Sequence, residues 1–191
     1  MMTIYFITSN KGKFSEVKEK MRCLNVSLKQ ENFGYPEIQA STLEEVAGYG
    51  ANYIRKGFQN PFIIEDAGLF IDVLEGFPGV YSKYVFITIG CKGILKLIEG
   101  KKKRTATFKS VYVFSEPTKE PMFFIGECLG TIAPYEKGQG GFGYDPIFIP
   151  KGKSETFAEM SIKDKNKYSH RGKAFDNLIR FFIEKKGFEK K

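Results

Sequence analysis

The sequence is poor in the side chains that bind transition metals and form disulfides. Its single histidine, His170, excludes a site built from several histidine ligands. The three cysteines, Cys23, Cys91 and Cys128, are far apart and odd in number, and none stands in a CxxC spacing. This pattern argues against a zinc site and against a disulfide framework. We therefore expect the three thiols to be small, buried hydrophobic side chains.

Long hydrophobic runs, repeats and low-complexity tracts are also missing. No apolar run approaches the ~18 residues that a membrane helix needs, so we expect no membrane partner. The first residues, MMTIYFIT, lack the basic region and the cleavage site of a signal peptide. These absences predict a soluble, cytoplasmic protein. A length of 191 residues predicts one domain, spanning residues 1–191 and built as two lobes.

What the sequence has in excess is positive charge. The formal net charge is +8, and residues 151–191, with 12 Lys and Arg against 6 Asp and Glu, contribute +6 of it. A second basic cluster is formed by residues 101–104. Such an excess favours polyanionic ligands, either nucleotides or nucleic acid. For most of these residues a solvated, lysine-rich surface is the simpler interpretation.

Residue patterns in the first part of the chain predict alternating strands and helices. Residues 3–8 and 26–30 are typical of strands. Between them we expect a helix with an apolar face made by Phe14, Val17, Met21 and Leu24. Thr42 and Glu45 form a capping box, which predicts a helix from there to about Phe58. The segments FIIED, residues 62–66, and GLFIDVL, residues 68–74, read as two successive strands.

The second part of the chain predicts a helix, a hairpin and two or more final helices. Residues 80–99 are typical of a helix with a break near Gly90. The stretches 105–114 and 122–133 suit an antiparallel hairpin, and IFIP, residues 147–150, is a short strand. An apolar stripe marks the last helix: Ala174, Phe175, Leu178, Ile179, Phe182 and Ile183. The order of elements indicates an α/β protein with a mixed sheet flanked by helices.

The segment TIYFITSNKGKF, residues 3–14, has the features of a phosphate-binding loop. A helix N-terminus offers free backbone N–H groups and the positive end of the helix dipole. Thr8, Ser9 and Asn10 add polar side chains, and Lys13 adds a full positive charge. The spacing is not that of a Walker A motif. An asparagine helix cap with a surface lysine is the alternative interpretation of the same residues.

Adjacent acids, Glu65 and Asp66, follow the apolar run of a predicted strand. In a regular strand they would point to opposite faces, but we expect a bend at Gly68 to redirect one of them. Carboxylates beside a phosphate site commonly hold Mg²⁺, which neutralises phosphate charge and orients a water molecule. Glu37 is a candidate third acid. A solvated strand end is the alternative.

Two further segments carry residue types that recognise a nucleobase. In GGFGYDP, residues 140–146, glycines including Gly143 allow close backbone approach, and Phe142 and Tyr144 could stack on a flat base. Asp145 could accept hydrogen bonds from ring N–H groups. A tight structural loop with buried aromatic side chains is the alternative.

A basic segment precedes the last predicted helix. There Ser169, His170 and Arg171 stand together, and Arg171 could bind a base carbonyl or a phosphate oxygen. A lone histidine such as His170 is more often structural than functional. Each of these signals is weak alone, but a phosphate loop, acids, a stacking loop and a basic clamp together predict a nucleotide site.

Several short motifs occur in one order along the chain: TSNKGK, PEIQ, EDAGL, GFPGVYS, GGFGYDPIF, TFAEM and SHRGKAF. In these motifs the sequence resembles the inosine triphosphate pyrophosphatases over residues 3–183. That family hydrolyses non-standard purine nucleoside triphosphates (ITP, dITP and XTP) to the monophosphate and pyrophosphate. The resemblance implies an elongated mixed sheet, two lobes around a central nucleotide cleft, Mg²⁺ dependence and a homodimer. We expect no stable nucleic-acid partner, because the aromatic residues sit in a glycine loop rather than on an interleaved basic sheet face.

The resemblance also assigns roles to individual residues. It implies that Thr8, Asn10 and Lys13 bind the triphosphate, that Glu37 and Glu65 are metal-associated acids, and that Asp66 activates the attacking water. The base-recognition loop would be Phe142, Gly143, Tyr144 and Asp145. The segment that reads the purine and contacts phosphate would be Lys165, Ser169, His170 and Arg171.

The sequence departs from relatives of this family at two positions. Many have Ser or Thr where this chain has Ala67, so a hydroxyl contact is lost there. Many bacterial relatives carry a phosphate-contacting lysine where this chain has Gly50, and Lys56 lies nearly two helical turns further on. We therefore expect binding of the triphosphate to depend more on Lys13 and on the C-terminal basic residues.

The expected reaction is attack of water on the α-phosphorus, with pyrophosphate as the leaving group. In this hypothesis Asp66 is the general base, Lys13 stabilises phosphate charge, and Mg²⁺ held by Glu37, Glu65 and Asp66 bridges phosphate oxygens. Three alternatives stay open at this point. They are a Maf-like pyrophosphatase acting on other nucleotides, a nucleic-acid-binding module, and a nucleotide-binding regulator without turnover.

Overall fold

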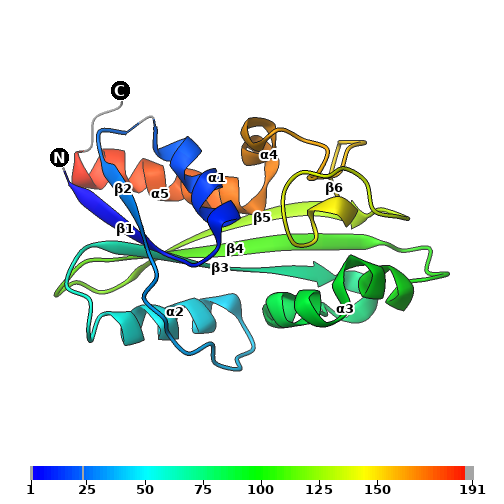
Figure 1. Ribbon diagram of the computed structural model, residues 1–191, viewed down its shortest axis with the longest axis horizontal. Helices are drawn as coiled ribbons and strands as arrows, with labels where there is room; N and C mark the ends of the chain where they lie inside the picture. The colour runs from blue at the N-terminus through cyan, green and yellow to red at the C-terminus, as the bar shows by residue number, and fades with distance from the viewer. Residues whose placement is uncertain (1, 23, 188–191) are drawn as a thin grey trace.

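The protein is described by a computed structural model that covers residues 2–22 and 24–187. Its centre is one six-stranded mixed sheet in the order β2-β1-β3-β4-β5-β6, which runs along the long axis of the molecule (Figure 1). β1 is parallel to both β2 and β3, whereas the pairs β3–β4, β4–β5 and β5–β6 are antiparallel. The strands are β1 Thr3–Ile7, β2 Ser27–Glu31, β3 Phe62–Ile71, β4 Thr105–Ser115, β5 Met122–Ile132 and β6 Phe148–Pro150. The predicted mixed α/β sheet is confirmed.

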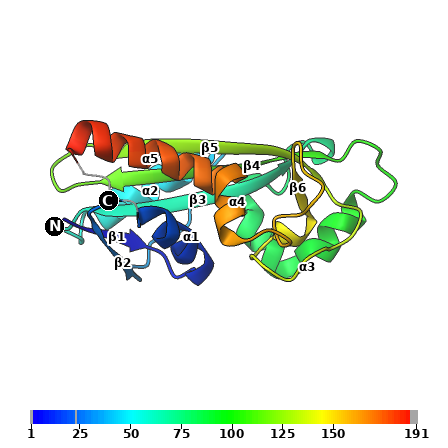
Figure 2. The same cartoon turned by 90° about the horizontal axis from the view of Figure 1, so that it is seen from above.

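Helices cover both faces of the sheet. α1, α4 and α5 lie on one face, and α2 and α3 lie on the other (Figure 1), while α5 follows β5 along much of its length (Figure 2). The helices are α1 Lys11–Met21, α2 Leu43–Ile54, α3 Ser82–Leu97, α4 Ile162–Tyr168 and α5 His170–Lys186. Three short 3₁₀ turns are η1 Asp72–Leu74, η2 Gly79–Tyr81 and η3 Asp145–Ile147. Within the described ranges no helix has the length and apolar character to cross a membrane.

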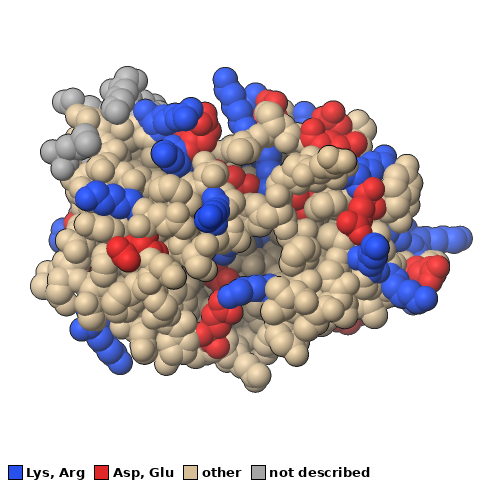
Figure 3. All heavy atoms as spheres, viewed as in Figure 1, with Lys and Arg blue, Asp and Glu red and all other residues tan. Residues whose placement is uncertain are grey.

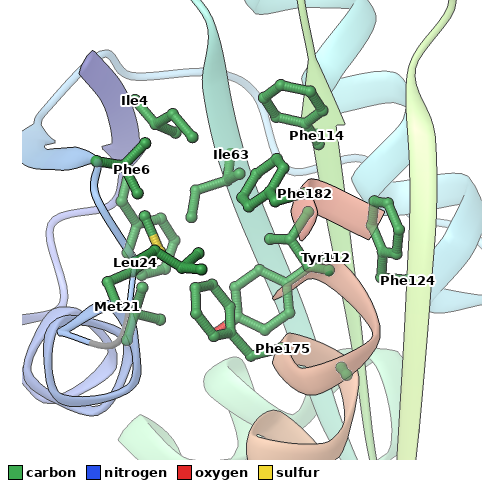
Figure 4. Close-up of a cluster of buried hydrophobic side chains, with 14 residues drawn as sticks. Ile4, Phe6, Met21, Leu24, Ile63, Tyr112, Phe114, Phe124, Phe175 and Phe182 are labelled. Atoms are coloured by element: carbon green, nitrogen blue, oxygen red, sulfur yellow. The ribbon is translucent and has the colours of Figure 1, made fainter. Parts of the chain in front are cut away.

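The hydrophobic core falls into three clusters. The first lies between the sheet and helices α1 and α5, and includes Phe6, Leu24, Tyr112, Phe175 and Phe182 (Figure 4). The second surrounds the α3 end of the sheet, and the third lies under α2. Cys91 and Cys128 are buried and unpaired, as predicted, whereas Cys23 lies outside the described residues. The division into two lobes stays a prediction.

Local sequence signals fix the helix starts. The Asn10 side chain caps α1 by accepting from the Lys13 backbone N–H, and both halves of the Thr42–Glu45 capping box are formed. α2 ends at Ile54, earlier than the predicted Phe58. Gly90 breaks α3 with a backbone φ of 62°, which a residue with a side chain would adopt only with strain.

The prediction of two strands separated by a bend at Gly68 is wrong. β3 is continuous over Phe62–Ile71, because β4 pairs with it at every one of these positions. Gly68 serves a different purpose, since a Cβ there would overlap the carbonyl oxygen of Gly79. The last predicted strand residues, DVL, form the 3₁₀ turn η1. Glu65 and Asp66 therefore point to opposite faces of an unbent strand.

One glycine sets how closely α5 approaches the sheet. A Cβ on Gly126 of β5 would overlap the backbone of α5 at the His170 carbonyl and the Ala174 nitrogen. α5 carries His170 and Arg171 at its start. The distance between the sheet and the start of α5, where His170 and Arg171 lie, thus depends on residue 126 being a glycine.

We predict that Gly126→Ala destabilises the fold by about 2–3 kcal/mol, because backbone on both sides must move to admit the methyl group. For a chain of this size the melting temperature should fall by roughly 5–10 °C. Gly34→Ala is the control, because a Cβ there has no neighbour within 4 Å. Equal melting temperatures for the two variants would contradict the close approach of α5.

Candidate active site

The predicted phosphate loop connects β1 to α1. The Asn10 backbone N–H donates to Thr8 Oγ1 at 3.1 Å, and the Lys13 N–H donates to Asn10 Oδ1 at 3.0 Å. These two bonds hold the loop in an open turn in front of the helix. Ser9 and Asn10 are exposed, so the first turn of α1 faces solvent there. The geometry suits an anion at a helix N-terminus.

Lys13 turns from this loop toward β3. Its Nζ lies 2.7 Å from Glu65 Oε2 and donates to the Glu65 carbonyl at 3.1 Å. Glu65 is fully buried and points to the α1 and α5 face. Burial alone would raise its pKa, but the charges of Arg171 and Lys13 and the Ser110 hydroxyl outweigh it and hold the pKa at about 2. Glu65 is therefore a permanent anion, paired with Lys13 through Oε2 and with Arg171 through Oε1, although Oε2 has no hydrogen-bond partner among the described residues.

Six buried or half-buried charges form one alternating chain through the site. Asp145 Oδ2 and Glu16 Oε1 each lie 2.6 Å from Lys165 Nζ. Glu16 Oε2 is 2.7 Å from Arg171 Nη1, and Arg171 Nε is 3.1 Å from Glu65 Oε1, which leads on to Lys13. Three acids face three bases, so the chain has no net charge. It joins the glycine loop, α4, α1, α5 and β3.

Glu16 is the member of this charge chain that the sequence analysis missed. It is 4% exposed, and it is the only acid that binds both Lys165 and Arg171 within the described chain. In the sequence it stands among lysines in an amphipathic helix, where a glutamate is normally solvated. A signal was present, because Lys13 and Glu16 are three residues apart and so share one side of α1. That side is next to the apolar face.

Asp66 lies on the other face of β3, in a different electrostatic environment. Burial raises its pKa to about 6, Lys13 opposes this effect, and the charge of Glu65 adds to it. Its hydrogen-bond partner is the backbone N–H of Ala67, at 3.0 Å from Oδ1. Glu37 is exposed and pairs with Lys83 at 2.6 Å. Asp66 is thus the acid of this site with the least compensated charge.

The fit of a metal ion differs among the three predicted ligands. In the described part of the chain no three His, Cys, Asp or Glu side chains gather as a ready-made metal site. Asp66 suits a cation, because its half-buried carboxylate carries charge that burial and Glu65 disfavour. Glu37 is accessible, whereas both oxygens of Glu65 are already bound by basic groups or Ser110. The metal assignment stays a prediction, with Asp66 as its best-supported member.

The glycine loop places one aromatic ring at the charge chain. The ring of Phe142 lies 4.8 Å from Lys165 Nζ and 5.1 Å from Arg171 Cζ, measured to its centroid. It also fills the space above Gly12, where a Cβ would be 2.5 Å from the ring. The loop therefore reaches the first turn of α1, next to the phosphate loop.

Tyr144 and Asp145 of the same loop are buried and already bonded. The Tyr144 hydroxyl donates to the Ser82 carbonyl at 3.0 Å, and its ring meets Phe86 edge-on. Asp145 accepts from the Phe142 N–H at 2.8 Å as well as from Lys165. In this conformation both side chains hold the loop in shape. Their predicted contacts with a base, and that of Gly143, stay predictions.

The SHR segment is buried rather than exposed. Ser169 caps α5 by accepting from the Gly172 N–H, and His170 stacks on Phe108 with a centroid distance of 4.4 Å. Burial and the nearby charges of Arg171 and Lys165 lower the pKa of His170 well below its usual value, so it is neutral. Its Nδ1 has no hydrogen-bond partner among the described residues. Its predicted role in reading the purine remains untested.

Gly50, one of the two departures, has a structural explanation. A Cβ on Gly50 would lie 2.7 Å from Cε2 of Tyr35 and 3.2 Å from Cδ1 of Ile64. The Tyr35 ring therefore fills the space that a side chain at position 50 would need. Ala67 is half-buried, and its N–H binds Asp66.

Charged side chains of both signs lie along the middle of the face shown in Figure 3, between the half with α1 and the half with α3. Pairing of this kind explains why the excess positive charge of the sequence does not form one basic surface there.

Comparison with known proteins identifies the family of this chain. A model of the Ham1 family matches residues 4–181. A dITP/XTP pyrophosphatase of Thermococcus kodakarensis is 51% identical over 183 residues, covering 96% of this chain and 98% of that protein. One from Methanopyrus kandleri is 47% identical, with 95% and 96% covered.

Solved structures show the same fold. A HAM1 protein from Coxiella burnetii has a TM-score of 0.84 at 31% identity, with 96% of this chain and 100% of that chain covered. The nucleoside-triphosphatase, or dITP/XTP pyrophosphatase, of Mycobacterium abscessus has a TM-score of 0.71 at 31% identity, with 93% and 99% covered.

We predict that Glu16→Gln lowers stability by about 3 kcal/mol, because it leaves two buried cations, Lys165 and Arg171, without their shared anion. Lys83→Gln breaks an exposed pair with Glu37 and should change stability by less than about 0.5 kcal/mol. Urea unfolding at neutral pH measures both. A loss at Glu16 no larger than that at Lys83 would contradict the buried chain.

Acid should weaken the fold through Glu65. The folded pKa of about 2 is below the ordinary value of 4.5, so the stability from this group is complete above pH 4.5 and is lost as pH falls toward 2. A shift of that size corresponds to about 3 kcal/mol. In urea unfolding between pH 5 and pH 2, Glu65→Gln should show a shallower loss of stability than the unmodified protein. Parallel curves would remove Glu65 from this role.

Proposed function

The chain belongs to the Ham1 family, and on this premise we propose that it hydrolyses non-standard purine nucleoside triphosphates, such as dITP and XTP. It is a nucleoside triphosphate pyrophosphatase, whose products are the nucleoside monophosphate and pyrophosphate. The relatives named dITP/XTP pyrophosphatase share almost its full length. The observation that supports this most directly is the buried charge chain, because it ties the phosphate loop to the loop with Phe142.

The reaction that fits these residues is water attack on the α-phosphorus. Asp66, the acid with the least compensated charge, takes the proton of the water. A bond forms between the water oxygen and the α-phosphorus, and the bond from that phosphorus to the bridging oxygen breaks. The leaving pyrophosphate takes the electron pair. Lys13 and the N–H groups at the start of α1 stabilise the negative charge of the phosphates.

We propose Mg²⁺ as the metal of this reaction. Held by Asp66 and Glu37, with Glu65 behind them, it would neutralise phosphate charge and orient the water. Lys13 can then turn from Glu65 to the phosphates while Arg171 and Ser110 still bind Oε1 of that carboxylate.

The base is proposed to stack on Phe142, above Lys165 and Arg171. Hypoxanthine and xanthine carry a 6-keto group, which donors from Arg171 and the backbone can bind. Adenine would leave such donors unpaired, and a site of this kind can reject the wrong base by about 10⁴-fold. Ser169 and His170 fix the start of α5 and so the position of Arg171. Gly143, Tyr144 and Asp145 hold the loop around the base.

Product analysis tests the function. The protein with Mg²⁺ should convert dITP and XTP to monophosphate and pyrophosphate while sparing ATP. Release of orthophosphate would instead mean attack at the γ-phosphorus and would overturn the proposed placement of the triphosphate.

We predict that Asp66→Asn lowers kcat by at least about 10³-fold, because the amide cannot take the proton of the water. Binding of XTP measured without Mg²⁺ should change little, since in this proposal Asp66 acts on the water and the metal and makes no direct contact with the nucleotide. Single-turnover kinetics and equilibrium binding of XTP measure the two effects. Turnover close to that of the unmodified protein would exclude Asp66 as the general base.

A homodimer is part of the proposal. Residues of the segment 77–89 that are apolar and large stand out of the surface: Phe77, Tyr81, Tyr84, Phe86, Ile87 and Ile89. Ile87 is 71% exposed and Tyr84 66% exposed. A patch of this kind on a surface helix is typical of a protein interface. Because the substrate is the free nucleotide pool, we also propose a cytoplasmic location.

We predict that Ile87→Asp converts the dimer to a monomer, because a charge would be buried at the centre of the contact. Leu97→Asp, on the same helix beyond the break at Gly90, should leave the dimer intact. Light scattering after size-exclusion chromatography gives the mass of each variant. A dimeric Ile87→Asp protein would place the interface elsewhere.

A further inference from the structure

Tyr35 is a half-buried phenol to which the mechanism above gives no role. It lies in the loop between β2 and α2, and its ring packs in the cluster under α2. The ring edge sits over Gly50, where a Cβ would be 2.7 Å from Cε2 and 3.0 Å from Cδ2. The fit is close enough to fix the ring, because Gly50 belongs to the buried side of α2.

This position places Tyr35 on the same face of the sheet as Asp66. A Cβ on Gly50 would also approach Cδ1 of Ile64 at 3.2 Å, so the Tyr35 ring and Ile64 share one pocket against α2. Ile64 and Asp66 are two residues apart on β3 and therefore project to one side. The loop residue Tyr35 thus lies on the face of β3 that carries the proposed general base, and Asp66 is the carboxylate with the strongest electrostatic effect on it.

The hydroxyl of Tyr35 is available for a new bond. Burial raises the pKa of Tyr35, and the carboxylates of Asp66, Glu37 and Glu65 raise it further, with Asp66 the strongest of the three. In residues 2–22 and 24–187 its oxygen has no hydrogen-bond partner, and it is not among the polar atoms sealed from solvent.

We propose that Tyr35 is a water-positioning residue, which holds the attacking water together with Asp66. This inference rests on the proposed function. A water molecule has two hydrogens, and Asp66 accepts one while the Tyr35 oxygen accepts the other. A lone pair of the water then points at the α-phosphorus. The proton goes to Asp66, the leaving pyrophosphate takes the electrons of the broken bond, and Tyr35 keeps its proton throughout.

Tyr35→Phe tests the inference, because it removes the hydroxyl and keeps the ring over Gly50. We expect kcat for XTP to fall about tenfold or more, since a poorly oriented water reacts slowly. The KM should stay within about twofold, because the phenol does not bind the nucleotide. Tyr53→Phe, at an exposed position of α2, is the matched control and should leave both constants unchanged.

Gly50→Ala supplies an independent second variant. Its methyl group must displace the Tyr35 ring, so kcat should fall by a similar factor with the hydroxyl still present. In the Tyr35→Phe background the same change should add less than about twofold, because the two act through one group. Thermal unfolding of each variant shows whether a decrease in kcat comes from a destabilised fold.

The outcomes separate the inference from the function on which it rests. A Tyr35→Phe protein with unchanged kcat, or with raised KM and unchanged kcat, overturns the water-positioning role and leaves the pyrophosphatase intact. The water-positioning role is also overturned if the kcat of the double variant Tyr35→Phe and Gly50→Ala falls by the product of the two single-variant factors. No pyrophosphate release by the unmodified protein would remove the proposed function itself.

Discussion

The site depends on a buried chain of alternating charges that runs from Asp145 through Lys165, Glu16 and Arg171 to Glu65 and Lys13. Transfer of single ions into a protein interior is very unfavourable, so each member is tolerated only because its neighbours are present. The chain also fixes geometry. It sets the distance between the loop that joins β1 to α1 and the loop that carries Phe142, although these loops are far apart in sequence.

β3 gives two adjacent acids opposite chemical behaviour. Glu65 points toward two cations and has a pKa of about 2, whereas Asp66 points to the other face and has a pKa of about 6. An unbent strand is what makes this separation possible, since neighbouring side chains alternate. One acid can thus stay permanently charged to organise the site while the other exchanges a proton.

Features set by neighbouring residues were predictable from the sequence. The Asn10 cap, the Thr42–Glu45 box and the break at Gly90 are correct because each depends on a few adjacent residues. The family motifs also predicted the fold. The continuity of β3 was not predictable, because it comes from pairing with β4.

Contacts between residues far apart in sequence also explain what the sequence analysis missed in the site. Glu16 looked like a solvated helix residue, because its partners Lys165 and Arg171 are 149 and 155 positions away. The reason for a glycine at position 50 was not visible in the sequence either, since only the folded loop brings Tyr35 onto it.

The distance in sequence between Glu16 and its partners Lys165 and Arg171 also sets the order in which the charge chain can form during synthesis. The ribosome makes Glu16 and Glu65 long before Lys165 and Arg171, so the emerging chain carries Glu16 without either of its cations and Glu65 with Lys13 but without Arg171. The buried charge chain is therefore among the last parts of the molecule to assemble.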